Sequence, residues 1–266
     1  MATLVTFHAH PDDEAISCGG TMAKAASERH RVVLVVATRG ENGEAPEGFL
    51  PPGESLSERR TKETEAAAAI LGVSRVAFLG YVDSGMLGTP ENEVPGSFWQ
   101  ADIDEAAGRL AAILTEEEAD VLTVYDPNGT YGHPDHVNVH RVGVRAAELA
   151  GTQRVYEVTA DRDHMAALMS RAEELGMDTS EFDDEDFDLD GFGTPRALIT
   201  TRVDVTAFLE QKRAAMAAHA SQIAETSFFL AMPPEAFTAT WGTEWFVRRG
   251  APADTEETGL FDGLGG

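Results

Sequence analysis

The stretch "TLVTFHAHPDDEAIS", residues 3–17, gives the clearest indication of the fold, because it predicts a strand, a turn and the start of a helix. Its start, Thr3 to His8, is mostly apolar or β-branched, which predicts a buried strand. Pro11 suits the first position of a helix, where no amide hydrogen is needed. The turn leads into three consecutive carboxylates, Asp12, Asp13 and Glu14. In the first turn of a helix the dipole stabilises each negative charge by about 0.3–1 kcal/mol, and a nearby metal ion is the other source of positive charge that would offset their repulsion.

The same alternation of strand and helix continues along the chain. Further strands are expected at residues 31–38, 75–80 and 120–126, and helices at residues 17–29, 55–73 and 100–117. This spacing predicts an α/β protein with a Rossmann-like, three-layer fold and a mostly parallel sheet. After Gly151 the pattern weakens, with one strand expected at 196–205 and one helix at 205–223. We expect a single domain, 1–266, with a core at about 1–160 and a C-terminal part at about 161–266 packed on it.

Composition excludes several classes of protein. The net charge of −26 argues against nucleic acid or an anionic membrane as a partner. No apolar run reaches the ~18–20 residues that span a bilayer, and the first residues lack the pattern of a signal peptide. The single cysteine, Cys18, is expected to be a packing residue. Together these features predict a cytoplasmic protein. The acidic stretch 180–191 is expected to be a solvated loop.

A second His-Pro pair occurs in "YGHPDHVNVH", residues 131–140, again between a predicted strand and a predicted helix. In a doubly wound sheet the first and fourth strands are neighbours at the topological switch point. Both turns would then face one crevice and gather six polar side chains there: His10, Asp12, Asp13, His133, Asp135 and His136. Two imidazoles and one carboxylate are a common catalytic zinc set. The spacing leaves His133 and His136 as alternatives for the second imidazole.

The neighbouring acids Asp12 and Asp13 are expected to divide two tasks. Adjacent helical residues point about 100° apart, so one carboxylate can bind the metal while the other reaches its water as a general base. His140 is expected to be structural or to support a ligand, and His8 to be a strand-end residue facing the core. His219 is left without an assigned role.

These motifs resemble the LmbE-like, or PIG-L, family of zinc-dependent N-deacetylases. The resemblance rests on "AHPDDE" (9–14) and "GHPDH" (132–136), with "ATRGENGE", "RTKETEAAAAILGV", "LGYVDSGM" and "KRAAMAAHASQ" in addition. It implies an LmbE-like fold and removal of an acetyl group from a small molecule that contains N-acetylglucosamine. It also implies Zn²⁺ as the cofactor, about one per chain, with Fe²⁺ as the alternative in the cell.

The resemblance implies a role for each residue of the site. His10, Asp13 and His136 would hold the metal, and Asp12 would be the general base. His133, charged, would stabilise the tetrahedral intermediate, Asp135 would orient His133, and Tyr131 would polarise the amide carbonyl. The stretches 79–86 and 125–137 look like the mycothiol branch, in which residues matching Arg60 and Asp83 contact the sugar-inositol substrate.

Several alternatives remain at this point. The first is an amide hydrolase of the mycothiol S-conjugate amidase type. The others are a metal phosphoesterase, which the acidic loops disfavour, and a non-catalytic module that binds a metal or a carbohydrate. A general base at Asp12 separates an enzyme from a binding module. The oligomeric state is open, with a homo-oligomer among the alternatives.

Overall fold

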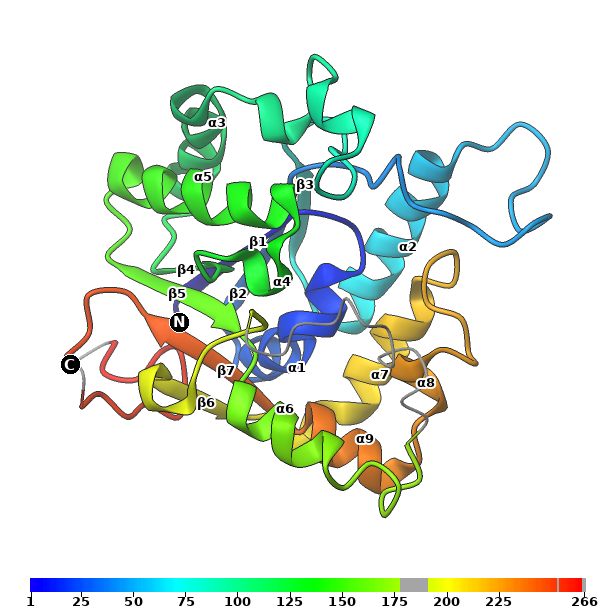
Figure 1. The fold of residues 1–266 in the computed structure, drawn as a ribbon. Helices are drawn as coiled ribbons and strands as arrows, with labels where there is room; N and C mark the ends of the chain where they lie inside the picture. Colours follow the sequence, from blue (N-terminus) through cyan, green and yellow to red (C-terminus); the bar gives the residue numbers. More distant parts are fainter. Residues whose placement is uncertain (178–190, 253, 265–266) are drawn as a thin grey trace.

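The computed structural model of the chain describes residues 1–177, 191–252 and 254–264, and shows a central seven-stranded sheet (Figure 1). The strands are β1 (Thr3–His8), β2 (Arg31–Val36), β3 (Arg75–Phe78), β4 (Val121–Tyr125), β5 (Arg154–Thr159), β6 (Thr201–Asp204) and β7 (Thr243–Arg248). Their order is β3-β2-β1-β4-β5-β7-β6. The first five are parallel, β7 is antiparallel to β5, and β6 is antiparallel to β7.

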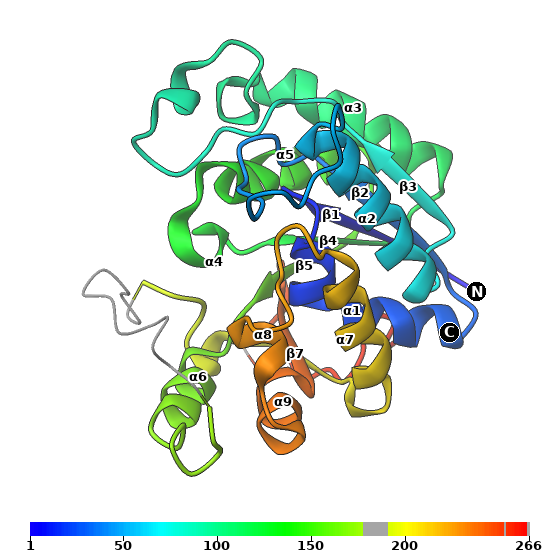
Figure 2. The same cartoon turned by 90° about the vertical axis from the view of Figure 1, so that its right-hand side faces the viewer.

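Helices cover both faces of this sheet. They are α1 (Asp13–Ser27), α2 (Leu56–Ile70), α3 (Ile103–Glu116), α4 (Gly129–Gly132), α5 (Pro134–Ala150), α6 (Arg162–Met169), α7 (Leu209–Ala218), α8 (Phe228–Ala231) and α9 (Pro234–Trp241). Helices α3 and α5 pack together on one face, and α7 packs against both α1 and α2 on the other. Figure 2 shows α6, α8 and α9 gathered near β7, on the side where α1 begins.

The structure confirms the predicted fold class and strand order. Strands β1 and β4 are parallel neighbours, with Leu4 opposite Val121 and Thr6 opposite Thr123. The sequence did not single out β5 and β7, because charged residues interrupt both. One of them, Glu157 in β5, is buried and accepts a hydrogen bond from Arg249 at 2.7 Å. Both C-terminal strands extend the sheet of the N-terminal part. The predicted acidic loop lies outside the described residues apart from Gly191.

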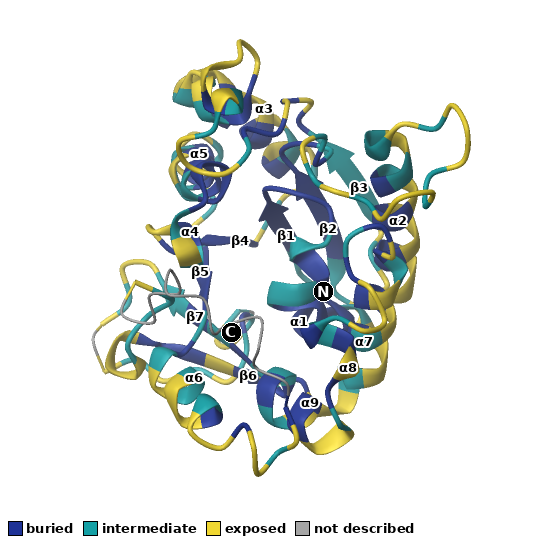
Figure 3. Ribbon diagram, turned by 45° about the vertical axis from the view of Figure 1, so that its right-hand side comes forward, coloured by how far each residue is buried: buried dark blue, intermediate teal, exposed yellow. Residues whose placement is uncertain are grey.

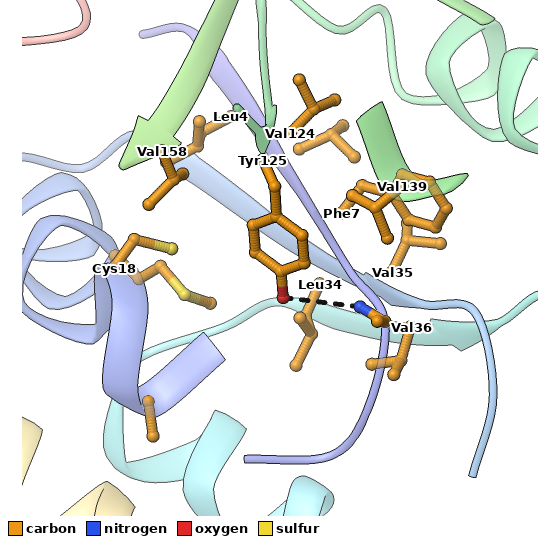
Figure 4. Close-up of a cluster of buried hydrophobic side chains, with 14 of the residues drawn as sticks. Leu4, Phe7, Cys18, Leu34, Val35, Val36, Val124, Tyr125, Val139 and Val158 are labelled. Carbon is orange, nitrogen blue, oxygen red and sulfur yellow. Dashed lines mark hydrogen bonds between the residues drawn. The ribbon is translucent and has the colours of Figure 1, made fainter. Parts of the chain in front are cut away.

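The core lies between the parallel strands and the helices on either side. Figure 3 shows the strands buried and the outer faces of the helices exposed. The phenol of Tyr125, at the end of β4, lies at the centre of an apolar cluster that includes Leu4, Phe7 and Val158 (Figure 4). His8 is fully buried, as expected, and its Nδ1 lies 2.9 Å from the Tyr125 hydroxyl. Cys18 is a buried free cysteine.

Helix α1 is interrupted at Cys18, where φ is −143° and ψ is 22°. At this break, backbone N–H and C=O groups on both sides of Cys18 are bonded by side chains from other elements. The buried carboxylate of Glu244, in β7, accepts the amide hydrogens of Gly20 and Thr21 at 2.9 and 2.7 Å. The fully buried Lys212 of α7 donates to the Ile16 carbonyl at 2.7 Å and to Glu244 at 2.5 Å. This ion pair joins the C-terminal part of the chain to the helix that follows the first His-Pro turn.

No helix in the described part of the chain is long and apolar enough to cross a membrane. A cytoplasmic location stays a prediction.

Replacing Lys212 by methionine should reduce the free energy of unfolding by about 3–5 kcal/mol, because Glu244 would keep a buried charge without its partner. Urea denaturation followed by circular dichroism measures this change. The control is Arg145→Ala, which removes an ion pair between the exposed side chains of Arg145 and Asp104 and should cost no more than about 1 kcal/mol. Equal losses in the two variants would contradict the structural role of the buried pair.

Candidate active site

The first His-Pro turn connects β1 to α1. Helix α1 begins at Asp13, and Asp12 is its N-cap with φ 101° and ψ −32°. The expectation that Asp12 lies in the first helical turn is therefore wrong. A positive φ at a residue other than glycine costs of the order of 1–3 kcal/mol and persists where surrounding contacts enforce it. This conformation separates the directions of the Asp12 and Asp13 carboxylates.

The second His-Pro turn connects β4 to α5. His133 is the N-cap of α5, Pro134 is its first residue, and the His133 Nδ1 accepts the amide hydrogen of Asp135 at 3.1 Å. The short helix α4 precedes it and lies close against the first turn of α5. At Gly129, where φ is 63°, a Cβ atom would lie 2.6 Å from the Cβ of His136. Only glycine allows this approach.

The pairing of β1 with β4 brings the two turns together, as predicted. One Asp13 carboxylate oxygen, Oδ2, lies 3.5 Å from His10 Nδ1 and 3.5 Å from His136 Nε2. Ring nitrogens of His10, His133 and His136 also lie within 4.8 Å of one another. This arrangement offers a metal ion two or three imidazole nitrogens and one carboxylate, and each donor is buried or nearly so.

The far nitrogen of His10 faces two further carboxylates. His10 Nε2 lies 3.1 Å from Asp135 Oδ2 and 3.5 Å from Asp83 Oδ1. Although burial lowers the pKa of His10, hydrogen bonds to Asp13, Asp135 and Asp83 raise it well above its usual value. A proton held on Nε2 by these partners leaves the lone pair of Nδ1 free to bind a metal ion beside Asp13.

Asp135 differs from its predicted role as the group that orients His133. Its carboxylate contacts His10 and accepts the Ser84 amide hydrogen at 2.9 Å. The hydrogen bond between Asp135 and His133 involves the backbone N–H of Asp135, which donates to the imidazole. In this structure the Asp135 carboxylate therefore orients His10, and its backbone orients His133.

The pKa values of the adjacent carboxylates Asp12 and Asp13 are shifted in opposite directions. Burial raises the pKa of Asp12 to about 6, against the lowering effect of the Arg60 guanidinium. Burial also acts on Asp13, but the imidazoles of His136 and His10 outweigh it and lower its pKa. Two neighbouring acids with opposite shifts suit different tasks: Asp13 stays ionised as a ligand, and Asp12 can exchange a proton near neutral pH.

Burial favours the neutral form of the imidazoles of His133 and His136. Burial lowers both pKa values, that of His136 to about 3. Because His133 Nδ1 accepts a hydrogen bond, the proton of the neutral ring is on Nε2. This direction favours a neutral His133 that donates its Nε2 hydrogen over the charged ring that the sequence suggested, and the charge of His133 in the working enzyme stays a prediction.

Tyr131, in α4, has an exposed fraction of 49%, and its hydroxyl lies 3.4 Å from His136 Nε2. Burial of the hydroxyl end raises the pKa of Tyr131, since desolvation disfavours the phenolate. The hydroxyl can donate a hydrogen bond beside the candidate metal position, and its contact with the amide carbonyl of a substrate stays a prediction.

Arg60 and Asp83, the two predicted substrate residues, are buried rather than displayed on an open surface. Arg60 donates to the Pro11 carbonyl at 2.6 Å, to the Gly40 carbonyl at 3.0 Å and to Asp12 Oδ2 at 3.3 Å. Arg60 therefore holds the first His-Pro turn. Asp83 lies next to His10 and accepts the Gly85 amide hydrogen at 2.8 Å. Substrate contact by either residue stays a prediction.

Sequence reasoning missed one pair at this site. Glu14 and His219 are both fully buried, and Glu14 Oε1 lies 2.7 Å from His219 Nε2. The two residues are 205 positions apart, so no local pattern connects them. His140 Nδ1 lies 3.0 Å from the Tyr125 carbonyl, and its structural or supporting role stays a prediction.

A cavity of about 440 Å³ opens beside Asp12, Asp13, His136 and Tyr131. Neither Arg60 nor Asp83 lines it. Most of its wall comes from apolar side chains of the C-terminal part: Met165, Phe228, Phe229, Trp241 and Trp245. The site therefore has a polar side, where Asp83 lies, and an apolar side.

The chain is similar to a known family of proteins. The PIG-L model, described as GlcNAc-PI de-N-acetylase, matches residues 5–147. A 1D-myo-inositol 2-acetamido-2-deoxy-alpha-D-glucopyranoside deacetylase of Acidothermus cellulolyticus is 42% identical over 279 residues, covering 99% of this chain and 96% of that protein. An enzyme of the same name, numbered 1, from Catenulispora acidiphila is 40% identical, covering 98% and 89%.

Among solved structures, the N,N'-diacetylchitobiose deacetylase of Pyrococcus horikoshii matches with a TM-score of 0.56 and 23% identity, covering 98% of this chain and 86% of that one. At this identity the likeness shows the shared fold alone. The family match and the two sequence relatives go further: the family model covers residues 5–147, more than half of the chain, and the relatives span nearly the whole chain. The protein belongs to the PIG-L family and is a deacetylase.

Proposed function

We propose that the chain is a metal-dependent N-deacetylase that acts on a small molecule containing N-acetylglucosamine. One observation carries the proposal: a single Asp13 oxygen contacts ring nitrogens of both His10 and His136, directly beside Asp12. The donor set of two imidazoles and a carboxylate fits Zn²⁺ and also suits Fe²⁺. His10, Asp13 and His136 would hold the ion, and a bound Zn²⁺ supplies Lewis-acid polarisation and a lowered pKa of water.

In this proposal the chain's own side chains divide the remaining work. Asp12, ionised above about pH 6, takes a proton from the attacking water. His133 donates its Nε2 hydrogen, and Tyr131 its hydroxyl hydrogen, to the oxygen on which negative charge develops. Asp135 and Asp83 keep the proton of His10 on Nε2, so that Nδ1 stays a ligand. Asp12 then returns the proton to the leaving amine.

The proposed substrate follows from the relatives. Their names specify an N-acetylglucosamine linked to inositol. The loops 40–55 and 82–97 follow strand ends at the edge of the sheet that carries the site, and Asp83 in the second loop lies within 3.5 Å of His10. Buried carboxylates of this kind form strong hydrogen bonds to sugar hydroxyls.

The apolar cavity favours a second candidate, an amidase of the mycothiol S-conjugate type. A methyl group alone does not fill a space of about 440 Å³ beside Tyr131 and His136. An amide with a larger apolar acyl group would use this space. Comparing hydrolysis of N-acetylglucosaminyl-inositol with that of the same sugar carrying larger N-acyl groups separates the two candidates. A preference for acetyl supports the deacetylase, and a preference for larger acyl groups supports the amidase.

Substitution of Asp12 by asparagine should lower kcat/KM by about 10² or more while metal content is unchanged, because the water loses its general base. Metal analysis of the same sample provides the control. In the parent enzyme kcat/KM should fall as the pH falls through about 6, since protonated Asp12 cannot accept a proton. A bound cation shifts this limb toward lower pH. An Asp12→Asn enzyme as active as the parent would contradict the mechanism and favour a role for another base.

Replacing Asp83 by alanine should lower kcat/KM for N-acetylglucosaminyl-inositol by about tenfold or more, the equivalent of one strong hydrogen bond to the sugar. The matched control is Asp104→Ala, which removes an exposed carboxylate of α3 that is paired with Arg145. Steady-state amine release and metal content are measured together. Unchanged kinetics in Asp83→Ala would remove the main support for this substrate class, whereas loss of metal would show that Asp83 acts only through His10.

A further inference from the structure

The third acid of the "PDDE" turn has a partner of its own. Glu14 Oε2 accepts the backbone amide hydrogen of Asp12 at 3.0 Å, and Glu14 Oε1 lies 2.7 Å from His219 Nε2. Glu14 and His219 have no exposed surface. The Glu14 carboxylate therefore bridges the backbone of Asp12 and a histidine that follows α7.

Asp12 needs such support because its backbone is strained. Its φ of 101° is unfavourable for a residue with a side chain, so the conformation depends on contacts around it. Glu14 holds the amide hydrogen of Asp12. On the other side, Arg60 holds the Pro11 carbonyl and the Asp12 carboxylate. The peptide unit before Asp12 is thus held at its oxygen by one charged group and at its nitrogen by another.

We infer that Glu14 and His219 are a positioning pair, which keeps the strained backbone of Asp12 in place and so aims its carboxylate at the reacting water. The inference rests on the proposed function, in which Asp12 is the general base. His219 does not itself line the cavity, and its ring nitrogen Nε2 is paired with Glu14. It acts through Glu14, and Glu14 acts through the Asp12 amide.

The loss of His219 would leave a buried carboxylate with its strongest partner missing. Glu14 would then move or take up a proton, and its hold on the Asp12 amide would weaken. Without that hold the backbone of Asp12 can relax toward a negative φ, which displaces its carboxylate. A displacement of about 1 Å at a reacting group can cost about 10² in rate.

The alternative is that the pair only fastens the end of α7 to α1. The same turn offers a matched control for that role. Ser221, two residues after His219, donates to Glu63 through its amide at 3.0 Å and through its hydroxyl at 2.6 Å, and so fastens the turn to α2. Ser221→Ala removes a buried tertiary hydrogen bond without touching Glu14.

The test compares His219→Leu, His219→Gln and Ser221→Ala for kcat, KM, metal content and melting temperature. Glutamine places an N–H donor near the position of His219 Nε2, and leucine has none. We expect His219→Leu to lower kcat by about tenfold or more with KM within about twofold and full metal content, because ground-state binding is unaffected. His219→Gln should recover most of kcat, and Ser221→Ala should lose stability but keep kcat.

A double-mutant cycle with Asp12→Asn gives the sharpest result. If His219 acts through Asp12, His219→Leu should cause no further loss of kcat in the Asp12→Asn background. The inference would be overturned if the losses of kcat in the two single variants multiplied in the double variant, or if the His219→Leu enzyme had a normal kcat. If His219→Leu does not fold, Glu14→Asp, which shortens the bridge by one methylene, is taken through the same cycle with the same criteria. An Asp12→Asn enzyme that keeps its activity would instead refute the proposed base itself.

Discussion

The parallel pairing of β1 with β4 is the constraint on which the rest of the structure depends. It brings together the carboxyl ends of two strands that are far apart in the sequence: Leu4 lies opposite Val121 and Thr6 opposite Thr123, so paired residues are 117 positions apart. Each strand leads into a His-Pro turn and a helix. Because the two turns share one edge of the sheet, side chains from residues 10–13 and 133–136 meet in one buried cluster.

The three adjacent acids that open α1 are compatible because each has a different partner. Asp13 faces the imidazoles of His10 and His136, and Glu14 is paired with His219. Of the three acids only Asp12 has a raised pKa, of about 6, because its burial outweighs the lowering effect of the Arg60 guanidinium. The cluster thus divides into a ligand, a structural pair and a group able to exchange a proton. Histidine partners for Asp13 and Glu14, and burial for Asp12, create this division.

Much of this arrangement could be predicted from the sequence, because local patterns carry it. The strand at Thr3–His8, the His-Pro pair between each of the two strands and its helix, and the alternation of strands and helices lead to the fold and to the meeting of the two turns, although Pro11 precedes the N-cap of α1 rather than starting the helix. Long-range contacts could not be predicted in this way. The partner of Glu14 is 205 residues away, and the backbone strain at Asp12 depends on Arg60 and Glu14 together. The role of Asp135 was misjudged because the choice between His10 and His133 depends on side-chain direction.

The central claim is that the two turns form one metal site with His10 Nδ1, Asp13 and His136 as its ligands, leaving Asp12 as the base. X-ray diffraction from crystals of the purified protein, with anomalous data on both sides of the zinc absorption edge, tests it most directly. The account predicts one strong zinc peak within coordination distance of His10 Nδ1, an Asp13 carboxylate oxygen and His136 Nε2. A peak on the alternative group of buried donors, His10, Asp83 and Asp135, or a zinc-loaded crystal with no peak at either position, would contradict it.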